Sequence, residues 1–249
     1  MYDSLKDAYE HKRNIEEVYE VFKEKQKPAF ELSKEQMCTF LHEIENGVGT
    51  VFTFIPFVIT LMDRPNLLDH LPERFDTKDM KIFLDFSLMV AKNTISSYAE
   101  DDLYEKVFNP VKMFPVINGN LSDAIMKHDE SKLSEPERSC YDKFIPMLKL
   151  YKFGTPEYYS VRQQMKEHPG GKHIFTNRHH PEFFGDKLIY GMNLVDFLEM
   201  FMDHIASSFR SDTSLRDGEK SNAERYKYPK YVLNMIINSY DEMYPESNQ

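Results

Sequence analysis

Apolar side chains recur at helical spacing along most of this chain. In residues 2–26 the period is close to 3.6, with apolar positions at Leu5, Ala8, Ile15, Val18 and Phe22. Further helices are predicted over residues 33–45, 77–98, 122–128, 155–167, 193–209 and 229–240. Several begin at a residue that caps helices well, such as Ser33 with Gln36 three positions on, or Asn193. The pattern therefore predicts an all-α fold.

Three stretches interrupt or strain this pattern. Residues 107–120, VFNPVKMFPVINGN, hold two prolines, a glycine and three asparagines, and they predict a long connection. Residues 211–222, SDTSLRDGEKSN, predict a polar loop. Residues 51–62, VFTFIPFVITLM, are the most apolar run, and they are too short to span a bilayer. They predict a buried helix that is kinked at Pro56 or begins there.

Composition narrows the classes of function. The 249 residues suit one or two domains, and the nine glycines are too few for a strand-rich sandwich. The formal net charge of −10 argues against a uniformly basic nucleic-acid surface, although it allows a local basic patch. Cys38 and Cys140 are expected to be reduced thiols, and the first residues form no apolar signal. We therefore expect a cytoplasmic protein without membrane or nucleic-acid partners.

The first chemical motif is AIMKHDESKLSEPE, residues 124–137, in which His128 and Asp129 are adjacent at the end of an apolar helical stretch. Neighbours on a helix point about 100° apart, so the pair shares a target only where the backbone relaxes at the helix end. A buried pair of this kind offers a divalent metal one nitrogen and one oxygen ligand. The alternative is a solvated helix end.

The second motif is NLVDFLEMFMDHIA, residues 193–206, where apolar residues cover nearly every side of the expected helix. Asp196, Glu199 and Asp203 nevertheless fall on one stripe. Buried carboxylates are costly unless they are paired or bind a metal, so we expect at least Asp203 to face a polar pocket. The alternative is a solvent-facing stripe with surface salt bridges.

The third motif is TNRHHPEFF, residues 176–184, because His173, His179 and His180 fall within eight residues. We expect this loop to form a wall of the site, held by hydrogen bonds of Asn177. His180 is expected near the metal, and His179 farther away, facing the substrate. The alternative is that each histidine is structural.

These motifs carry a resemblance to a known group. HDESKLSEPE, YKFGTPEYY, NRHHPEFF and MNLVDFLEMFMDHIASSFR resemble an uncharacterised family of bacteria and phages that is related to the HD-domain metal phosphohydrolases. The resemblance runs from about Asp123 to Tyr240. It implies an HD-domain-like helical bundle that holds a divalent metal through an upstream histidine, His128, Asp129 and Asp203. For the upstream ligand we prefer His11, in EHKRNIEEV, to its competitor His42, in FLHEIENGV.

The chain departs from the family pattern in three respects. A long segment precedes the HD pair, so we expect a first core helix in residues 1–27, a helical insertion or lid in 28–115, and the metal-binding core in 116–249. The insertion is a candidate surface for homo-oligomers. In related nucleotidases an acid follows shortly after the HD pair. Here the acid is Glu130, directly adjacent to the pair, and Lys132 lies two positions beyond it. His204 stands where relatives usually carry an aromatic residue.

The resemblance implies metal-dependent hydrolysis of a nucleotide or a related phosphate ester. The expected metal ligands are His11, His128, Asp129, Asp203 and His180, the last as a fifth ligand or as a ligand to a second ion. The catalytic candidates are His179, Lys132 and Glu130, and the substrate-binding candidates are Lys132, Arg178, Asn177 and Arg210. Tyr158, Phe183 and Phe184 either stack a base or pack in the core.

The metal is expected to be Mn, Fe, Co, Ni, Zn or Mg, and the ligand a small phosphate or nucleotide. If a phage encodes the chain, the host cytoplasm is its expected location. The alternative function is a non-catalytic module that keeps the metal to bind a nucleotide, as a sponge does, or that binds another protein.

Overall fold

The computed structural model describes residues 3–26, 31–98, 110–152 and 155–245. Every regular element in these ranges is a helix, which confirms the all-α prediction. The α-helices are α1 (Ser4–Lys25), α2 (Lys34–Glu45), α3 (Val51–Asp63), α4 (Lys78–Tyr98), α6 (Pro110–Lys127), α7 (Glu137–Leu148), α8 (Pro156–Glu167), α9 (His173–Thr176), α10 (Leu194–Ser208), α11 (Leu215–Tyr226) and α12 (Lys230–Met243). The 3₁₀ segments are η1 (Pro65–His70), η2 (Glu73–Phe75), η3 (Glu130–Leu133) and η4 (Pro181–Gly191).

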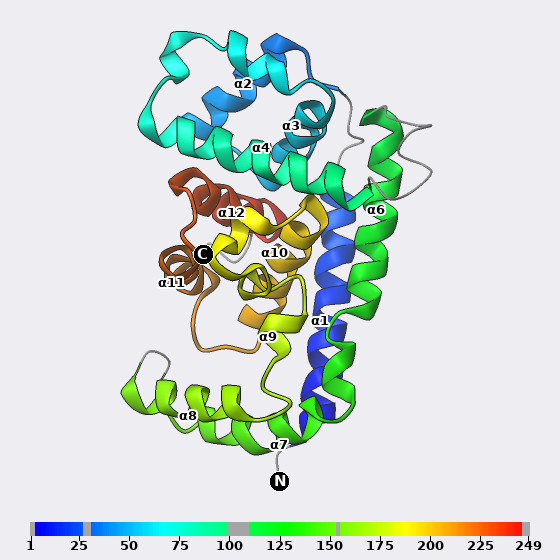
Figure 1. The fold of residues 1–249 in the computed structure, drawn as a ribbon, viewed down its shortest axis with the longest axis vertical. Helices are drawn as coiled ribbons and strands as arrows, with labels where there is room; N and C mark the ends of the chain where they lie inside the picture. Colours follow the sequence, from blue (N-terminus) through cyan, green and yellow to red (C-terminus); the bar gives the residue numbers. More distant parts are fainter. Residues whose placement is uncertain (1–2, 27–30, 99–109, 153–154, 246–249) are drawn as a thin grey trace.

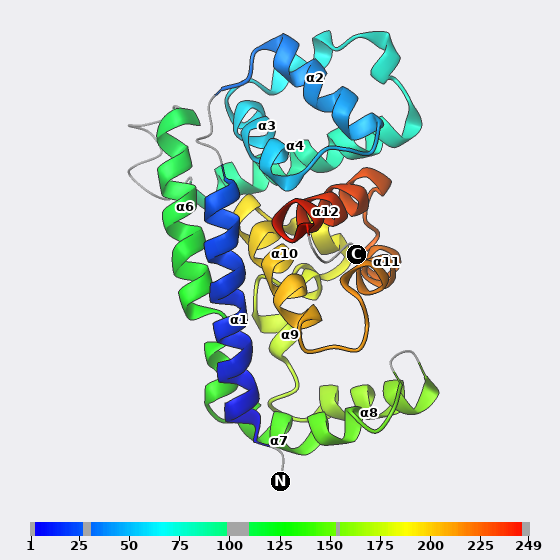
Figure 2. The ribbon, with the colours of Figure 1, turned by 180° about the vertical axis from the view of Figure 1, so that it is seen from behind.

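Helix α10 lies at the centre of the molecule. It contacts α1, α4, α6 and α11, and Figures 1 and 2 show α1 and α6 running side by side along it. Apolar residues cover almost all of its circumference, so it is buried on nearly every side. Asn193 caps its first turn, with Asp196 completing a capping box. This cap and the buried surface fix the position of the carboxylates that α10 carries.

Helices α2, α3 and α4 lie together at one end of the molecule (Figure 1). Their core is aromatic, with buried side chains at Phe40, Phe54, Phe57, Phe83 and Phe86. The apolar run at 51–62 is the buried helix α3, as predicted, but it begins at Val51, and Pro56 lies inside it. Across the described residues, no helix combines the length and the apolar character needed to cross a membrane.

Helices α7 and α8 pack against each other at the opposite end, near the N-terminus (Figure 1). They have a small core of their own, made of Cys140, Phe144, Leu148, Val161 and Met165. Thr155 caps α8 and Pro156 stands at its first position, as the sequence predicts.

The predicted connection at 107–120 is wrong for its described part. Residues 107–109 lie outside the described residues, but α6 runs from Pro110 through Pro115 to Lys127, so Ser122 lies inside a helix instead of opening one. Pro110 stands at the first helical position, where the missing amide costs nothing. Ile117, Leu121 and Ile125 then form a buried stripe at four-residue spacing. Burial of this stripe outweighs the poor helix propensity of the segment.

The predicted loop at 211–222 is also wrong over most of its length. Helix α11 begins at Leu215, where the Ser214 side chain accepts a hydrogen bond from the backbone N–H of Asp217. The helix has few apolar residues, so it shows little hydrophobic periodicity. Its burial rests on Leu215, Glu219 and Tyr226, and one of these is a charged residue that the pattern could not assign to a core.

Candidate metal centre

Three segments bring the first group of four ligand residues together. His11 comes from α1, His128 and Asp129 follow the last turn of α6, and Asp203 comes from α10. Asp129 adopts the left-handed conformation, with φ of 58°, which aspartate tolerates better than most residues. This turn lets two adjacent side chains face one target, as the HD motif requires. All four side chains are buried.

The ligand atoms of this group are close-packed. His11 Nε2 lies 2.8 Å from Asp203 Oδ1, 3.3 Å from His128 Nε2 and 3.6 Å from Asp129 Oδ2. His128 Nε2 lies 3.5 Å from Asp129 Oδ2 and 3.6 Å from Asp203 Oδ1. Four ligands of one tetrahedral ion stand about 3.3 Å apart, so the spacing suits a divalent ion.

The histidine loop forms a second group around the other oxygen of Asp129. His173 Nε2 lies 2.9 Å and His179 Nε2 3.6 Å from Asp129 Oδ1. The ligand atoms of His173, His179 and His180 all lie within 4.8 Å of one another. Asp129 thus presents Oδ2 to His11 and Oδ1 to the loop.

Unsatisfied polar atoms test whether these residues fit a metal. The buried Nε2 atoms of His173, His179 and His180 and the Oδ1 atom of Asp129 have no hydrogen-bond partner. His173 Nε2 lies 2.9 Å from Asp129 Oδ1, so these two atoms face each other. Buried polar atoms without other partners are costly, and this cluster of imidazole nitrogens beside a carboxylate matches the donor set of a cation. The residues therefore fit a bound ion.

Two carboxylates orient the imidazoles. Glu199 Oε1 lies 2.9 Å from His128 Nδ1 and 3.1 Å from His179 Nδ1. Glu137 Oε2 lies 2.9 Å from His173 Nδ1 and also accepts a hydrogen bond from Ser131. A carboxylate that accepts a hydrogen bond from Nδ1 orients the ring and leaves Nε2 available to a metal. Metal-binding histidines are usually oriented in this way.

The carboxylates of this centre are ionised, while one of its imidazoles carries a proton. Burial opposes the charge of His128, but Asp129, Asp203 and Glu199 raise its pKa to about 10, so a bound ion would have to displace that proton. Burial opposes the charge of Asp203, but hydrogen bonds to His11 and His128 hold its pKa well below the ordinary value. Burial also opposes the charge of Glu199, and its histidine partners lower its pKa to about 2. Burial lowers the pKa of His180, and the neighbouring histidines add to the effect. Ionised carboxylates and neutral imidazoles are the states that bind metals.

A cavity of about 150 Å³ opens beside the first group of ligands. His11 and Asp129 line it together with Lys132, Tyr141 and Arg210. Lys132 pairs with Asp129 Oδ2, and its ammonium lies 5.2 Å from the centre of the Tyr141 ring. Burial raises the pKa of Tyr141 to about 12, so its hydroxyl stays protonated. The cavity accepts a phosphate-sized group but not a whole nucleoside, since drug-sized pockets span about 300–1,000 Å³.

Both histidines of the loop lie at the cluster, so their division of roles stays a prediction. The ring of His179, expected to lie farther from the metal, is 4.3 Å from that of His128 and tilted by 42°, and Glu199 holds it. His180 lies next to it, with ring centres 4.3 Å apart. The structure therefore brings both rings to the ligand atoms. Asn177 donates to the backbone oxygen of His173, so it holds the loop.

Three candidates lie away from these ligand atoms. The Glu130 side chain is 57% exposed and pairs with Lys12 at 3.7 Å. Arg178 forms a two-pronged ion pair with Asp196, at 2.9 Å and 2.7 Å, and its guanidinium stacks over Phe183 and Phe184. These contacts occupy its donors, so the structure does not support phosphate binding by Arg178. His42 is exposed on α2 and contacts Glu45 and Asn46.

Sequence reasoning gave no ligand role to His173 and no orienting role to Glu137 or Glu199. The sequence could have indicated the role of Glu199, because this residue lies one helical turn before Asp203 on the same face of the helix. Glu137 is the last residue of HDESKLSEPE, and His173 was counted only in the density of histidines. Their roles depend on how α7 and α9 fold back onto the HD turn.

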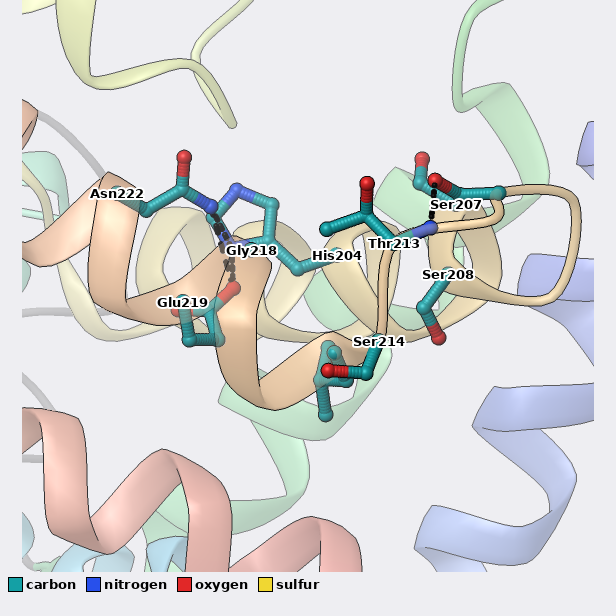
Figure 3. A pocket seen from close by; sticks show the side chains of 10 residues that line it. His204, Ser207, Ser208, Thr213, Ser214, Gly218, Glu219 and Asn222 are labelled. Atoms are coloured by element: carbon teal, nitrogen blue, oxygen red, sulfur yellow. Dashed lines mark hydrogen bonds and ion pairs between the residues drawn. The ribbon is translucent and has the colours of Figure 1, made fainter. Parts of the chain in front are cut away.

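His204 follows Asp203 in sequence but belongs to a different cavity, shown in Figure 3. Its Nδ1 lies 2.6 Å from Glu219 Oε1, and Asn222 donates to the same carboxylate (Figure 3). Serine and threonine side chains line the rest of this space of about 150 Å³. Ser207, at its edge, donates to Asp203 Oδ1 at 3.2 Å and so touches the metal centre.

The fold and the site define an all-helical protein with clustered imidazole and carboxylate ligands. The chain belongs to the Family of unknown function (DUF5662), which matches residues 92–243, more than half of its length. This match includes every predicted ligand except His11, which α1 contributes from outside it. No curated protein and no solved structure matches the chain.

Proposed function

We propose that the protein is a metal-dependent phosphohydrolase, and that the residues on the two sides of Asp129 would hold two divalent ions. The observation that carries this is the pair of donor groups facing the two oxygens of Asp129. His11 and His128 lie beside Oδ2, at 3.6 Å and 3.5 Å, and Asp203 holds His11. His173 and His179 lie beside Oδ1, at 2.9 Å and 3.6 Å, and His180 clusters with these two histidines.

The donor set narrows the choice of metal. Five imidazoles and two carboxylates form a mixed nitrogen and oxygen set, which suits Mn, Fe, Co, Ni or Zn better than Mg, an ion that prefers oxygen. Bound there, such ions supply Lewis-acid polarisation of a phosphoryl oxygen and activation of water. The HD-domain resemblance, with its histidine, HD pair and later aspartate, supports the same assignment.

Cationic residues beside the ligands would position the substrate phosphate. Lys132 and Arg210 line the cavity next to Asp129, where Lys132 pairs with Asp129 and Arg210 with Asp7, so a phosphate would share these cations with their carboxylates. Tyr141 lines the same cavity and its hydroxyl remains protonated, so it can donate a hydrogen bond to a substrate oxygen. The small cavity would hold the phosphate, while the remainder of the substrate stays outside it.

A second candidate function is a binding module that holds the metal and a nucleotide without turnover. The observation favouring it is the position of Glu130, since the only acid adjacent to the HD pair points to Lys12 and solvent. Both functions require the metal centre, but only the phosphohydrolase would hydrolyse the bound nucleotide.

The test combines elemental analysis with a hydrolysis screen. The purified protein is expected to contain about two ions per chain and to hydrolyse a phosphomonoester or nucleotide with Mn, Mg, Co, Ni or Fe supplied. Asp203→Asn should lower hydrolysis by more than about 100-fold, since losing an orienting residue alone costs about 10–100-fold. His42→Ala is the matched control and should retain metal and activity. Full metal content in Asp203→Asn contradicts the assignment, and metal without hydrolysis favours the binding module.

A further inference from the structure

A larger cleft, of about 750 Å³, lies between α8 and α11, which Figure 1 shows facing each other on one side of the molecule. Its volume falls in the range of about 300–1,000 Å³ that is usual for small-molecule sites. None of its lining residues lines the cavity beside the metal ligands. The cleft is therefore a separate candidate site.

The α8 wall combines aromatic and cationic side chains. Tyr158 and Tyr159 pack edge to face, with ring centres 5.9 Å apart, and Tyr159 is 56% exposed. Arg162 and Lys166 stand one helical turn apart on the same wall. Within the described residues, neither has an ion-pair partner. Two uncompensated cations in a chain of net charge −10 mark a local basic patch that would attract an anion.

The α11 wall is polar and mixed in charge. Ser221, Asn222 and Glu224 line this wall; the Ser221 hydroxyl donates to the Asp217 backbone oxygen and keeps its acceptor capacity, and the Asn222 amide nitrogen donates to Glu219. Arg225 is held by Glu182, so it adds little free charge. Hydroxyl, amide and carboxylate groups are suited to ribose hydroxyls and to the amino groups of a base.

We propose that this cleft binds a nucleotide, with its base against the tyrosines, its phosphates on Arg162 and Lys166, and its ribose towards α11. Aromatic faces stack bases of any kind, and guanidinium and ammonium groups are the usual phosphate donors. A purely anionic ligand would make no use of the tyrosine rings or of the Glu224 carboxylate. A nucleotide would contact both the α8 wall and the α11 wall.

The cleft and the candidate metal centre have separate linings. Lys132 belongs to the metal-side cavity and Arg162 to the cleft. Binding in the cleft requires no turnover, so this proposal stands or falls separately from hydrolysis.

Calorimetric titration of the metal-containing protein tests the proposal. The probe is α,β-methylene-ADP, whose phosphate chain resists hydrolysis. Arg162→Ala and Lys166→Ala should each weaken binding by about tenfold, since each removes a charge-assisted hydrogen bond. Tyr159→Ala should also weaken it by about tenfold, whereas Tyr159→Phe should keep the affinity because the ring remains. Inorganic pyrophosphate should bind more weakly than the nucleotide.

Arg13→Ala combined with Lys81→Ala is the charge-matched control, because both residues are exposed and lie outside the cleft. The control should leave the affinity unchanged. The proposal is overturned by absent binding, by equal losses in the control, or by unchanged affinity in Arg162→Ala. Much tighter binding of a single-stranded oligonucleotide would instead assign the cleft to nucleic acid. Metal content, measured on the same samples, separates these outcomes from a failure of the metal centre.

Discussion

Two buried histidine–carboxylate clusters stand next to each other on α10, and they differ in what they leave unsatisfied. Asp203 belongs to the metal centre, and its neighbour His204 belongs to the pair with Glu219. In the second cluster one imidazole meets one carboxylate and Asn222. In the first, three Nε2 atoms and one carboxylate oxygen remain without hydrogen-bond partners.

The difference shows that burial of histidine beside an acid does not by itself indicate a metal. Glu219 Oε2 also lacks a partner, but a single orphan oxygen beside one imidazole does not form a coordination sphere. Several imidazole nitrogens gathered around both oxygens of one carboxylate offer the ligands of such a sphere. The expected contrast is that mutations in the first cluster change metal content, whereas those in the second change stability.

The largest effect is expected for Asp129→Asn, because Asp129 serves both donor groups. Asparagine tolerates the left-handed backbone at this position, so the fold should be retained. Elemental analysis should show loss of most metal at both positions. His42→Ala should retain the wild-type content, and an unchanged content in Asp129→Asn would remove the basis for a bridged centre.

Asp203→Ala and His180→Ala should each lower the metal content by about half as much as Asp129→Asn. Asp203 lies closest to His11 and His128, although His179 also belongs to its cluster, and His180 clusters with the other histidines of the loop. Each variant should therefore lose about one equivalent of metal and retain the other. If either variant lost both ions equally, the two groups would form one cooperative site instead of two.

Glu199→Gln should have an intermediate effect. The glutamine keeps the size of the side chain but weakens its grip on His128 and His179, so metal affinity should fall by about 10–100-fold. Competition with a chelator measures this affinity. Wild-type affinity in Glu199→Gln would mean that Asp129 and Asp203 alone orient the site.

The smallest effect on metal is expected for Glu219→Gln. Loss of the partner leaves His204 in a buried site without its counter-ion, so the free energy of unfolding should fall by about 2–3 kcal/mol. Urea unfolding measures this change, and elemental analysis should show the full metal content. A loss of metal in this variant would erase the contrast between the two clusters.

Most helices could be predicted from the sequence, and the errors have a common cause. The Ser33 and Asn193 caps mark the starts of α2 and α10 because capping is a local interaction within one turn. The helix over 122–128 was predicted, but the earlier part of α6 was missed because its prolines and asparagines disfavour a helix locally, while its buried stripe stabilises one. That stabilisation comes from α1 and α10, which no local pattern can reveal.

The sequence by itself determined which residues could serve as ligands: the HD pair, the histidine loop and the acids of α10 are types and spacings that need no tertiary structure. Tertiary packing decided how they combine. It placed His11 from α1, outside the family match, against Asp203, and it directed the two oxygens of Asp129 to different groups. It also turned Glu130 towards Lys12 and tied Arg178 to Asp196. The physical reason is that a metal centre depends on distances between helices, which the packing of distant apolar surfaces sets.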